Sequence, residues 1–138
     1  MQKRNHWQFT DQELEQTFAD FKLKPGMFSH EAHLRLAYIH IKKYGVEQAE
    51  INMCRQIKGF AESLGVHDKF NLTVTIASVK TMNHFIQKAK SPDFKEFINE
   101  FPQLLTDFKA ILAQHYGFNV FADQRAKKEF IQPDLLPF

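Results

Sequence analysis

The 138-residue sequence contains a single cysteine, Cys54, and this scarcity excludes a disulfide-stabilised domain. A lone cysteine cannot form an intramolecular disulfide, so nothing in the composition indicates an oxidising compartment. Zinc or redox motifs of the Cys-x-x-Cys type are excluded for the same reason. We therefore expect a cytoplasmic protein.

The sequence has 18 basic and 16 acidic side chains, so neither sign of charge dominates and the net charge is +2. This charge is too small to indicate a polyanionic partner, and no motif that reads nucleic acid is present, so we expect no nucleic-acid partner. No apolar run approaches the ~18 residues that span a bilayer, so we expect no membrane partner. Lys3 and Arg4 precede no apolar stretch, so a signal peptide is not expected.

Familiar catalytic motifs are also missing. The five glycines form no phosphate-binding loop and no Gly-x-Ser-x-Gly elbow. The sequence contains neither His-Glu-x-x-His nor Glu-x-x-His, the helical signatures of zinc proteases and di-iron bundles. The residues therefore assign no reaction and no cofactor, and leave open whether the protein is an enzyme.

Phenylalanine is abundant, with 15 copies against one tryptophan and three tyrosines, and we expect it to fill much of the core. Apolar residues recur at helical spacing between polar caps and Gly or Pro stops. Residues 72–76 alternate like a strand, but the helical spacing that continues to residue 89 favours a helix. The pattern predicts a single-domain all-α bundle over residues 1–138, with about six or seven helices and an extended C-terminal tail. The expected helices are 10–23, 29–44, 46–64, 71–90, 91–101, 102–116 and 123–130.

Two histidines, His30 and His33, stand one helical turn apart in the second expected helix, so both rings can reach a common point. On a helical projection, His30 lies near the centre of the apolar stripe and His33 at its edge, so both are expected to face protein. Glu31, Arg35 and Lys42 form the polar arc. We expect His30 to be structural and His33 to be the functional residue of the pair.

These two histidines do not predict a metal site. Their spacing is one residue shorter than the zinc-protease motif requires, and two neutral ligands are fewer than the three of a catalytic zinc site. The other histidines that could add a ligand resemble isolated surface residues; these are His6, His67, His84 and His115.

The segment Phe28-x-His30-x-x-His33-Leu34-Arg35-x-Ala37 resembles the opening signature of a family of small, uncharacterised bacterial all-helical proteins. Phe70-Asn71-Leu72-Thr73-Val74-Thr75 is similar to the Tyr-His-Glu-Thr-x-Thr block of that family, with Asn and Leu in place of His and Glu. Tyr116 through Ala126, Phe130 and Pro133-Asp134-Leu135 with Pro137 are similar to its C-terminal ending. The resemblance implies a bacterial helical protein but no particular activity.

Asn71 and Thr75 stand at i and i+4 on the inward side of the fourth expected helix. They can add hydrogen-bonding groups to the histidine pair, or act only as a helix cap and a back-bonded hydroxyl. We expect an interior pocket that binds a small ligand, lined by His30, His33, Asn71 and Thr75 with Phe28 and Tyr116 nearby. The alternatives are a metal-assisted enzyme that uses the histidines and a noncatalytic interaction protein in which they are structural. The sequence does not indicate an oligomeric state.

Overall fold

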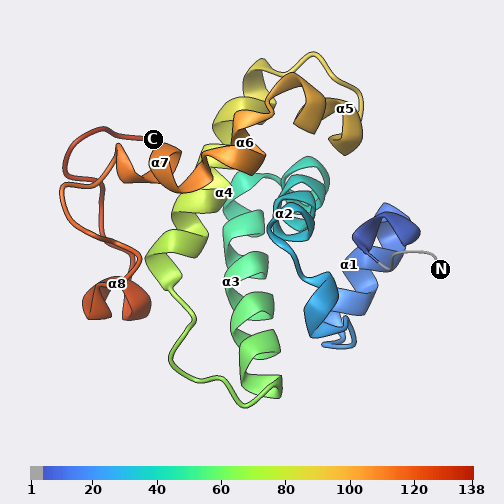
Figure 1. The fold of residues 1–138 in the computed structure, drawn as a ribbon, viewed down its shortest axis with the longest axis horizontal. Coiled ribbons are helices and arrows are strands. Elements are labelled where there is room, and N and C mark those ends of the chain that lie inside the picture. Colours follow the sequence, from blue (N-terminus) through green and yellow to red (C-terminus); the bar gives the residue numbers. More distant parts are fainter. Residues whose placement is uncertain (1–4) are drawn as a thin grey trace.

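The computed structural model describes residues 5–138, and all regular structure in this range is helical (Figure 1). The all-α prediction is confirmed. Lys3 and Arg4, on which the signal-peptide expectation rested, lie outside the described residues. The elements are η1 (His6–Gln8), α1 (Asp11–Ala19), η2 (Pro25–Met27), α2 (His30–Tyr44), α3 (Val46–Ser63), α4 (Leu72–Lys88), α5 (Phe94–Glu100), α6 (Gln103–Thr106), α7 (Phe108–Ala113) and α8 (Gln124–Lys128).

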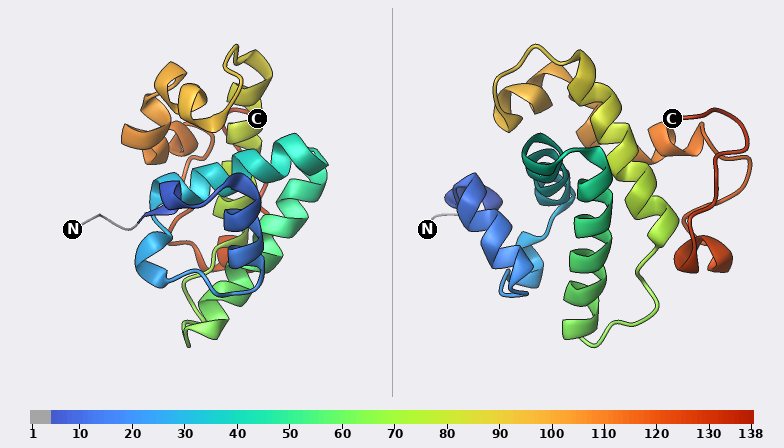
Figure 2. Two further views of the ribbon diagram at one scale, coloured as in Figure 1. Left: turned by 90° about the vertical axis from the view of Figure 1, so that its right-hand side faces the viewer. Right: turned by 180° about the vertical axis from the view of Figure 1, so that it is seen from behind.

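Helices α2, α3 and α4 pack against one another at the centre of the bundle. Helix α1 packs on α2 and α3, whereas α7 and α8 contact α4, so these elements lie on opposite sides of the centre (Figures 1 and 2). The main core lies between the central helices, α1 and α5. A smaller cluster joins α4 to the C-terminal third of the chain; its buried members are Ala77, Leu112, Tyr116, Val120 and Ala126.

Local capping explains where the long helices begin and end. Thr10 forms a capping box with Glu13, and the Ser29 hydroxyl accepts a hydrogen bond from the Ala32 amide. Gly45 ends α2 at a φ of 88°, which a residue with a side chain rarely adopts. Asn71 caps α4, so residues 72–76 are helical, as their continuation with residues 77–89 predicted.

Helix α1 ends four residues earlier than predicted, and Phe21 is the reason. Its φ of 58° is left-handed, a conformation that usually requires glycine. The Phe21 amide bonds the Phe18 carbonyl, and the Lys22 amide bonds the Thr17 carbonyl. The Phe21 ring fills the space above Gly59 on α3, where an added Cβ would clash with the ring Cζ. The side chain thus packs against α3 in a strained backbone conformation.

Two predicted boundaries in the second half of the chain are wrong. Asp93, rather than Ser91, caps α5, because the Asp93 carboxylate accepts from the Glu96 amide. The helix predicted over 102–116 is split into α6 and α7 at Asp107, whose φ and ψ of −130° and 24° are not helical. The Asp107 amide still donates to the Gln103 carbonyl at 2.8 Å, and the Thr106 hydroxyl donates to the Asp107 carboxylate at this break. The split adds a helix to the predicted number.

The extended C-terminal tail docks on the bundle. The Leu135 amide bonds the His115 carbonyl at 3.1 Å, and His115 Nδ1 donates to the Leu136 carbonyl at 2.7 Å. The Leu135 and Leu136 side chains are exposed, whereas the Phe138 ring stacks on His115. Hydrogen bonds of the tail backbone to His115 and the stacking of Phe138 therefore help to hold the tail.

Among the helices of residues 5–138, none combines the length and apolarity that crossing a bilayer would require.

Candidate functional site

His30 is the first residue of α2 and lies at the rim of the bundle. Its side chain is more exposed than its expected place near the centre of the apolar stripe implied, although its ring still contacts protein. Its Nε2 lies 2.9 Å from the Leu104 carbonyl, which can only accept, so Nε2 carries the proton and donates. The ring also meets the Phe108 ring edge-on, with centroids 5.1 Å apart. His30 thus joins α2 to the α6–α7 segment.

His33 is partly buried, and no hydrogen bond joins its ring to a side chain or backbone group of residues 5–138. Its ring lies against Phe28, with centroids 5.4 Å apart. Burial, together with the neighbouring His30, lowers the pKa of His33 to about 4. The ring is therefore neutral at pH 7 and offers one hydrogen-bond donor and one acceptor.

Both histidines line a cavity of about 650 Å³ where α2, α4, α6 and α7 meet. Most of its wall is apolar, and a few polar groups are placed among the apolar ones, as in known small-molecule sites. Its polar lining residues besides the histidines are Ser78, Thr106, Asp107 and Lys109. Its apolar lining residues are Leu34, Ala37, Val74, Met82, Leu105, Phe108, Ala110, Leu112 and Phe121.

Asn71 and Thr75 do not line this cavity. The Asn71 carboxamide caps α4 through the Val74 amide and donates to the Val120 carbonyl at 2.9 Å. The Thr75 hydroxyl donates to the Asn71 carbonyl at 2.8 Å, within its own helix. Both side chains thus have structural partners, which is the alternative that the sequence left open.

Phe28 and Tyr116 are also absent from the cavity wall. Phe28 stacks on Phe18, with centroids 4.8 Å apart, and contacts the cavity only indirectly, through His33. The Tyr116 hydroxyl donates to the Ile131 carbonyl at 2.8 Å and helps to hold the tail. The structure therefore brings together two of the six predicted site residues, His30 and His33.

Arg35 is the residue whose role sequence reasoning missed. The helical projection placed it on a solvated arc, but its side chain is buried beneath residues 6–11. Its guanidinium donates to the His6 and Phe9 carbonyls and to the Asp11 carboxylate, at 2.6 to 3.1 Å. A projection of one helix cannot show which segment covers it, so no local signal identified this role.

His6 and His115 are buried, which corrects the expectation that they lie on the surface. Arg35 Nη1 can only donate, so it requires an unprotonated His6 Nδ1, at 3.2 Å. His6 Nε2 then carries the proton and donates to Glu31 at 2.7 Å. Burial lowers the pKa of His6, although Glu31 opposes the effect. His6 is a neutral bridge between two charged residues of α2.

No group of three or more His, Cys, Asp or Glu side chains within residues 5–138 is arranged to hold a metal ion. At the cavity, the available nitrogen ligands are those of His30 and His33, and His30 Nε2 is already bonded to Leu104. The arrangement offers a neutral hydrogen-bonding group in an apolar hollow.

Neither a protein-family model, nor a curated protein, nor a solved structure matches this chain.

Proposed function

We propose that the protein binds a small, mostly apolar molecule in the cavity between α2, α4, α6 and α7, with His33 as its polar anchor. The observation that carries this proposal is the combination of an apolar cavity of about 650 Å³ with a His33 ring in its wall that has no hydrogen-bond partner among residues 5–138. The fold supplies such a partner to the rings of His30 and His6.

The chemistry of the wall defines the ligand class. A neutral imidazole exchanges hydrogen bonds with a hydroxyl, carbonyl or amide group and gives no ion pair to a carboxylate. The apolar wall favours an aromatic or aliphatic body, because burying apolar area contributes about 25 cal/mol per Å². The two charged lining residues, Asp107 and Lys109, have opposite signs and give the wall no net charge. The ligand that fits this wall is therefore an uncharged molecule with one polar group on an apolar frame.

The cavity can be filled from α7 without disturbing the core. Ala110 is exposed and lines the cavity, so Ala110→Trp puts an indole into the space that the ligand would occupy. Ala113 is exposed on the same helix and does not line the cavity, so Ala113→Trp is the matched control. The probe is 1-naphthol, which is uncharged at pH 7 and carries one hydroxyl on an aromatic frame.

We expect 1-naphthol to bind the native chain and the Ala113→Trp variant with one saturable site, and to bind Ala110→Trp at least about tenfold more weakly. Fluorescence titration measures all three affinities, and circular dichroism checks that each variant is folded. An absence of saturable binding to the native chain, or equal affinity for the two tryptophan variants, would contradict the proposal.

A further inference from the structure

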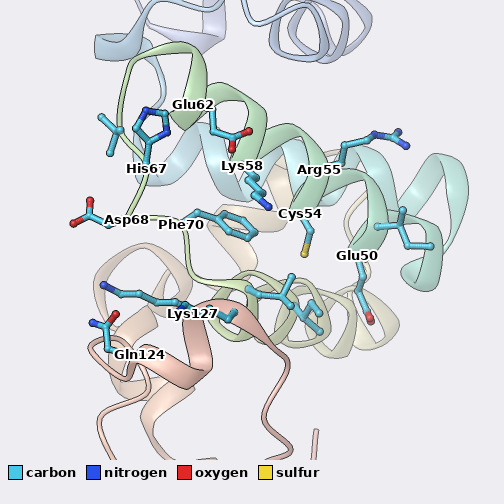
Figure 3. A pocket seen from close by; sticks show the side chains of 15 residues that line it. Glu50, Cys54, Arg55, Lys58, Glu62, His67, Asp68, Phe70, Gln124 and Lys127 are labelled. Carbon is cyan, nitrogen blue, oxygen red and sulfur yellow. The ribbon is translucent and has the colours of Figure 1, made fainter.

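A second cavity, of about 770 Å³, lies between α3, the 64–71 connection, the start of α4 and α8 (Figure 3). None of the residues that line it lines the His33 cavity, so the two sites are separate. Its floor is apolar and is formed by Ile51, Cys54, Val66, Phe70, Leu72 and Ile76.

The Cys54 thiol belongs to this apolar floor. Burial, and then the nearby Glu50 carboxylate, raise the pKa of Cys54 to about 12, so the sulfur carries no charge at pH 7. A neutral thiol behaves as a small apolar group. Figure 3 shows the sulfur directed toward the same space as the Phe70 ring.

Unpaired cations surround this floor. Lys58 of α3 and Lys127 of α8 lie on opposite sides of Phe70, and Lys128 also lines the cavity (Figure 3). Within residues 5–138 none of these three lysines lies within 4.0 Å of a carboxylate oxygen. Arg55 is a further lining cation, but its side chain points away from Phe70.

The carboxylates of the wall do not neutralise these lysines. Glu50 is already paired with Lys80, with Nζ and Oε2 3.2 Å apart. Asp68 is exposed and lies on the His67 side of the cavity (Figure 3). Glu62 is exposed and lies beside Lys58, one turn further along α3, but no ion pair of 4.0 Å or less joins them. The lysine ammonium groups therefore remain available over an apolar floor.

We propose that this cavity binds a small amphiphilic anion: a carboxylate or phosphate group held by Lys58, Lys127 and Lys128, with an apolar chain lying on Phe70 and Leu72. Charge complementarity selects the anionic end, and burial of the chain supplies affinity that an inorganic ion would lack. This inference does not depend on the ligand of the His33 cavity, because no residue is shared.

The probes are decanoate and decyl phosphate, used below their critical micelle concentrations, with 1-decanol as the uncharged analogue and inorganic phosphate as the chain-free anion. Calorimetric titration into the full chain measures each affinity. We expect both amphiphilic anions to bind one site, more weakly as salt rises, and at least about tenfold more tightly than decanol or inorganic phosphate. Comparison of the two anions identifies the preferred head group.

Two variants test the position of the site. Lys58→Glu combined with Lys127→Glu reverses two of the proposed contacts, and Lys90→Glu combined with Lys95→Glu is the charge-matched control because both lysines are exposed and line neither cavity. Leu72→Glu puts a carboxylate on the floor at the first position of α4, where the helix dipole tolerates it.

We expect the reversal and Leu72→Glu to weaken decanoate binding at least about tenfold, and the control pair to change it by less than about twofold. Circular dichroism and the 1-naphthol affinity verify that each variant retains its fold and its other cavity. The proposal is overturned if no anion binds, if decanol binds as tightly as decanoate, or if the reversal and control pairs behave alike.

Discussion

His30 and His33 lie one turn apart on α2, but His30 alone has its ring bonded by the fold, through the Leu104 carbonyl at 2.9 Å. This difference gives His30 a structural contact and is the basis for proposing His33 as the ligand-binding residue of the pair. It also accounts for the low pKa of His33, because the ring is desolvated and receives no carboxylate partner, while His30 adds a repulsive charge when protonated.

The low pKa of His33 predicts a specific loss of stability in acid. In the unfolded chain the ring takes up a proton near its ordinary pKa of 6.5, whereas in the fold it does so only at about 4. The neutral His33 ring therefore makes its full contribution to the free energy of unfolding above pH 6.5. This contribution is lost as the pH decreases toward 4, and the loss amounts to up to about 3 kcal/mol. Urea unfolding between pH 7.5 and about 4 measures it.

His33→Gln is the comparison, because its carboxamide does not titrate. His6 and His40 also have lowered pKa values, so these two histidines still reduce the stability of the variant in acid. We expect the free energy of unfolding to fall less steeply with pH in His33→Gln than in the native chain. Parallel curves for the two proteins would show that His33 is not desolvated in the fold.

Arg35→Met should destabilise the protein by about 3 kcal/mol, because it leaves Asp11 and two backbone carbonyls without their buried donor. Lys42→Met, on the same helix and exposed, should change the free energy of unfolding by less than about 0.5 kcal/mol. Chemical denaturation compares the two. Similar small effects would mean that residues 6–11 are not anchored by Arg35.

Phe21 and Gly59 should be energetically coupled. Gly59→Ala alone gains helix propensity but places its Cβ against the Phe21 ring, so we expect little or no net stabilisation. In a Phe21→Gly background the clash is removed, and the same substitution should stabilise the protein by about 1 kcal/mol. A double-mutant cycle by denaturation measures this coupling, and additive effects would contradict the packing of Phe21 on α3.

Removing the tail after Gln132 should lower the melting temperature, because it deletes the partners of His115 and of the Gly117 amide. The lost hydrogen bonds correspond to about 1 to 3 kcal/mol. Leu136→Ala should have almost no effect, since the exposed side chain contributes less than its backbone carbonyl. An unchanged melting temperature after truncation would show that the docked tail does not stabilise the bundle.

The sequence was sufficient for the long central helices because their caps and apolar periodicity agree, as at Ser29, Gly45 and Asn71. The sequence was insufficient where contacts between residues far apart in the chain override the local pattern of caps and apolar residues. The packing of Phe21 on Gly59 ends α1 at a strained residue, and residues 6–11 bury Arg35. Both depend on contacts between separate elements, which periodicity does not encode.

For the candidate site, too, local spacing was predictable from the sequence and contacts between separate elements were not. The i, i+3 spacing of His30 and His33 identified two residues of the cavity, because helix geometry alone brings them together. Asn71 and Thr75 were placed on the correct face of α4, but neighbouring backbone carbonyls occupy their polar groups. The wall contributed by α6 and α7 could not be predicted, because it depends on the break at Asp107.

The central claim is that His33 anchors the polar group of a ligand, and a matched ligand pair tests it most directly. 1-Naphthol and 1-methylnaphthalene have the same ring system, but only naphthol carries a hydroxyl. Fluorescence titration of both should show naphthol binding the native chain about tenfold more tightly, as one hydrogen bond provides, and binding His33→Leu no more tightly than the hydrocarbon. His84→Leu, at an exposed position of α4, should keep the native preference. A naphthol preference that survives in His33→Leu, or that is absent from the native chain, would contradict the account.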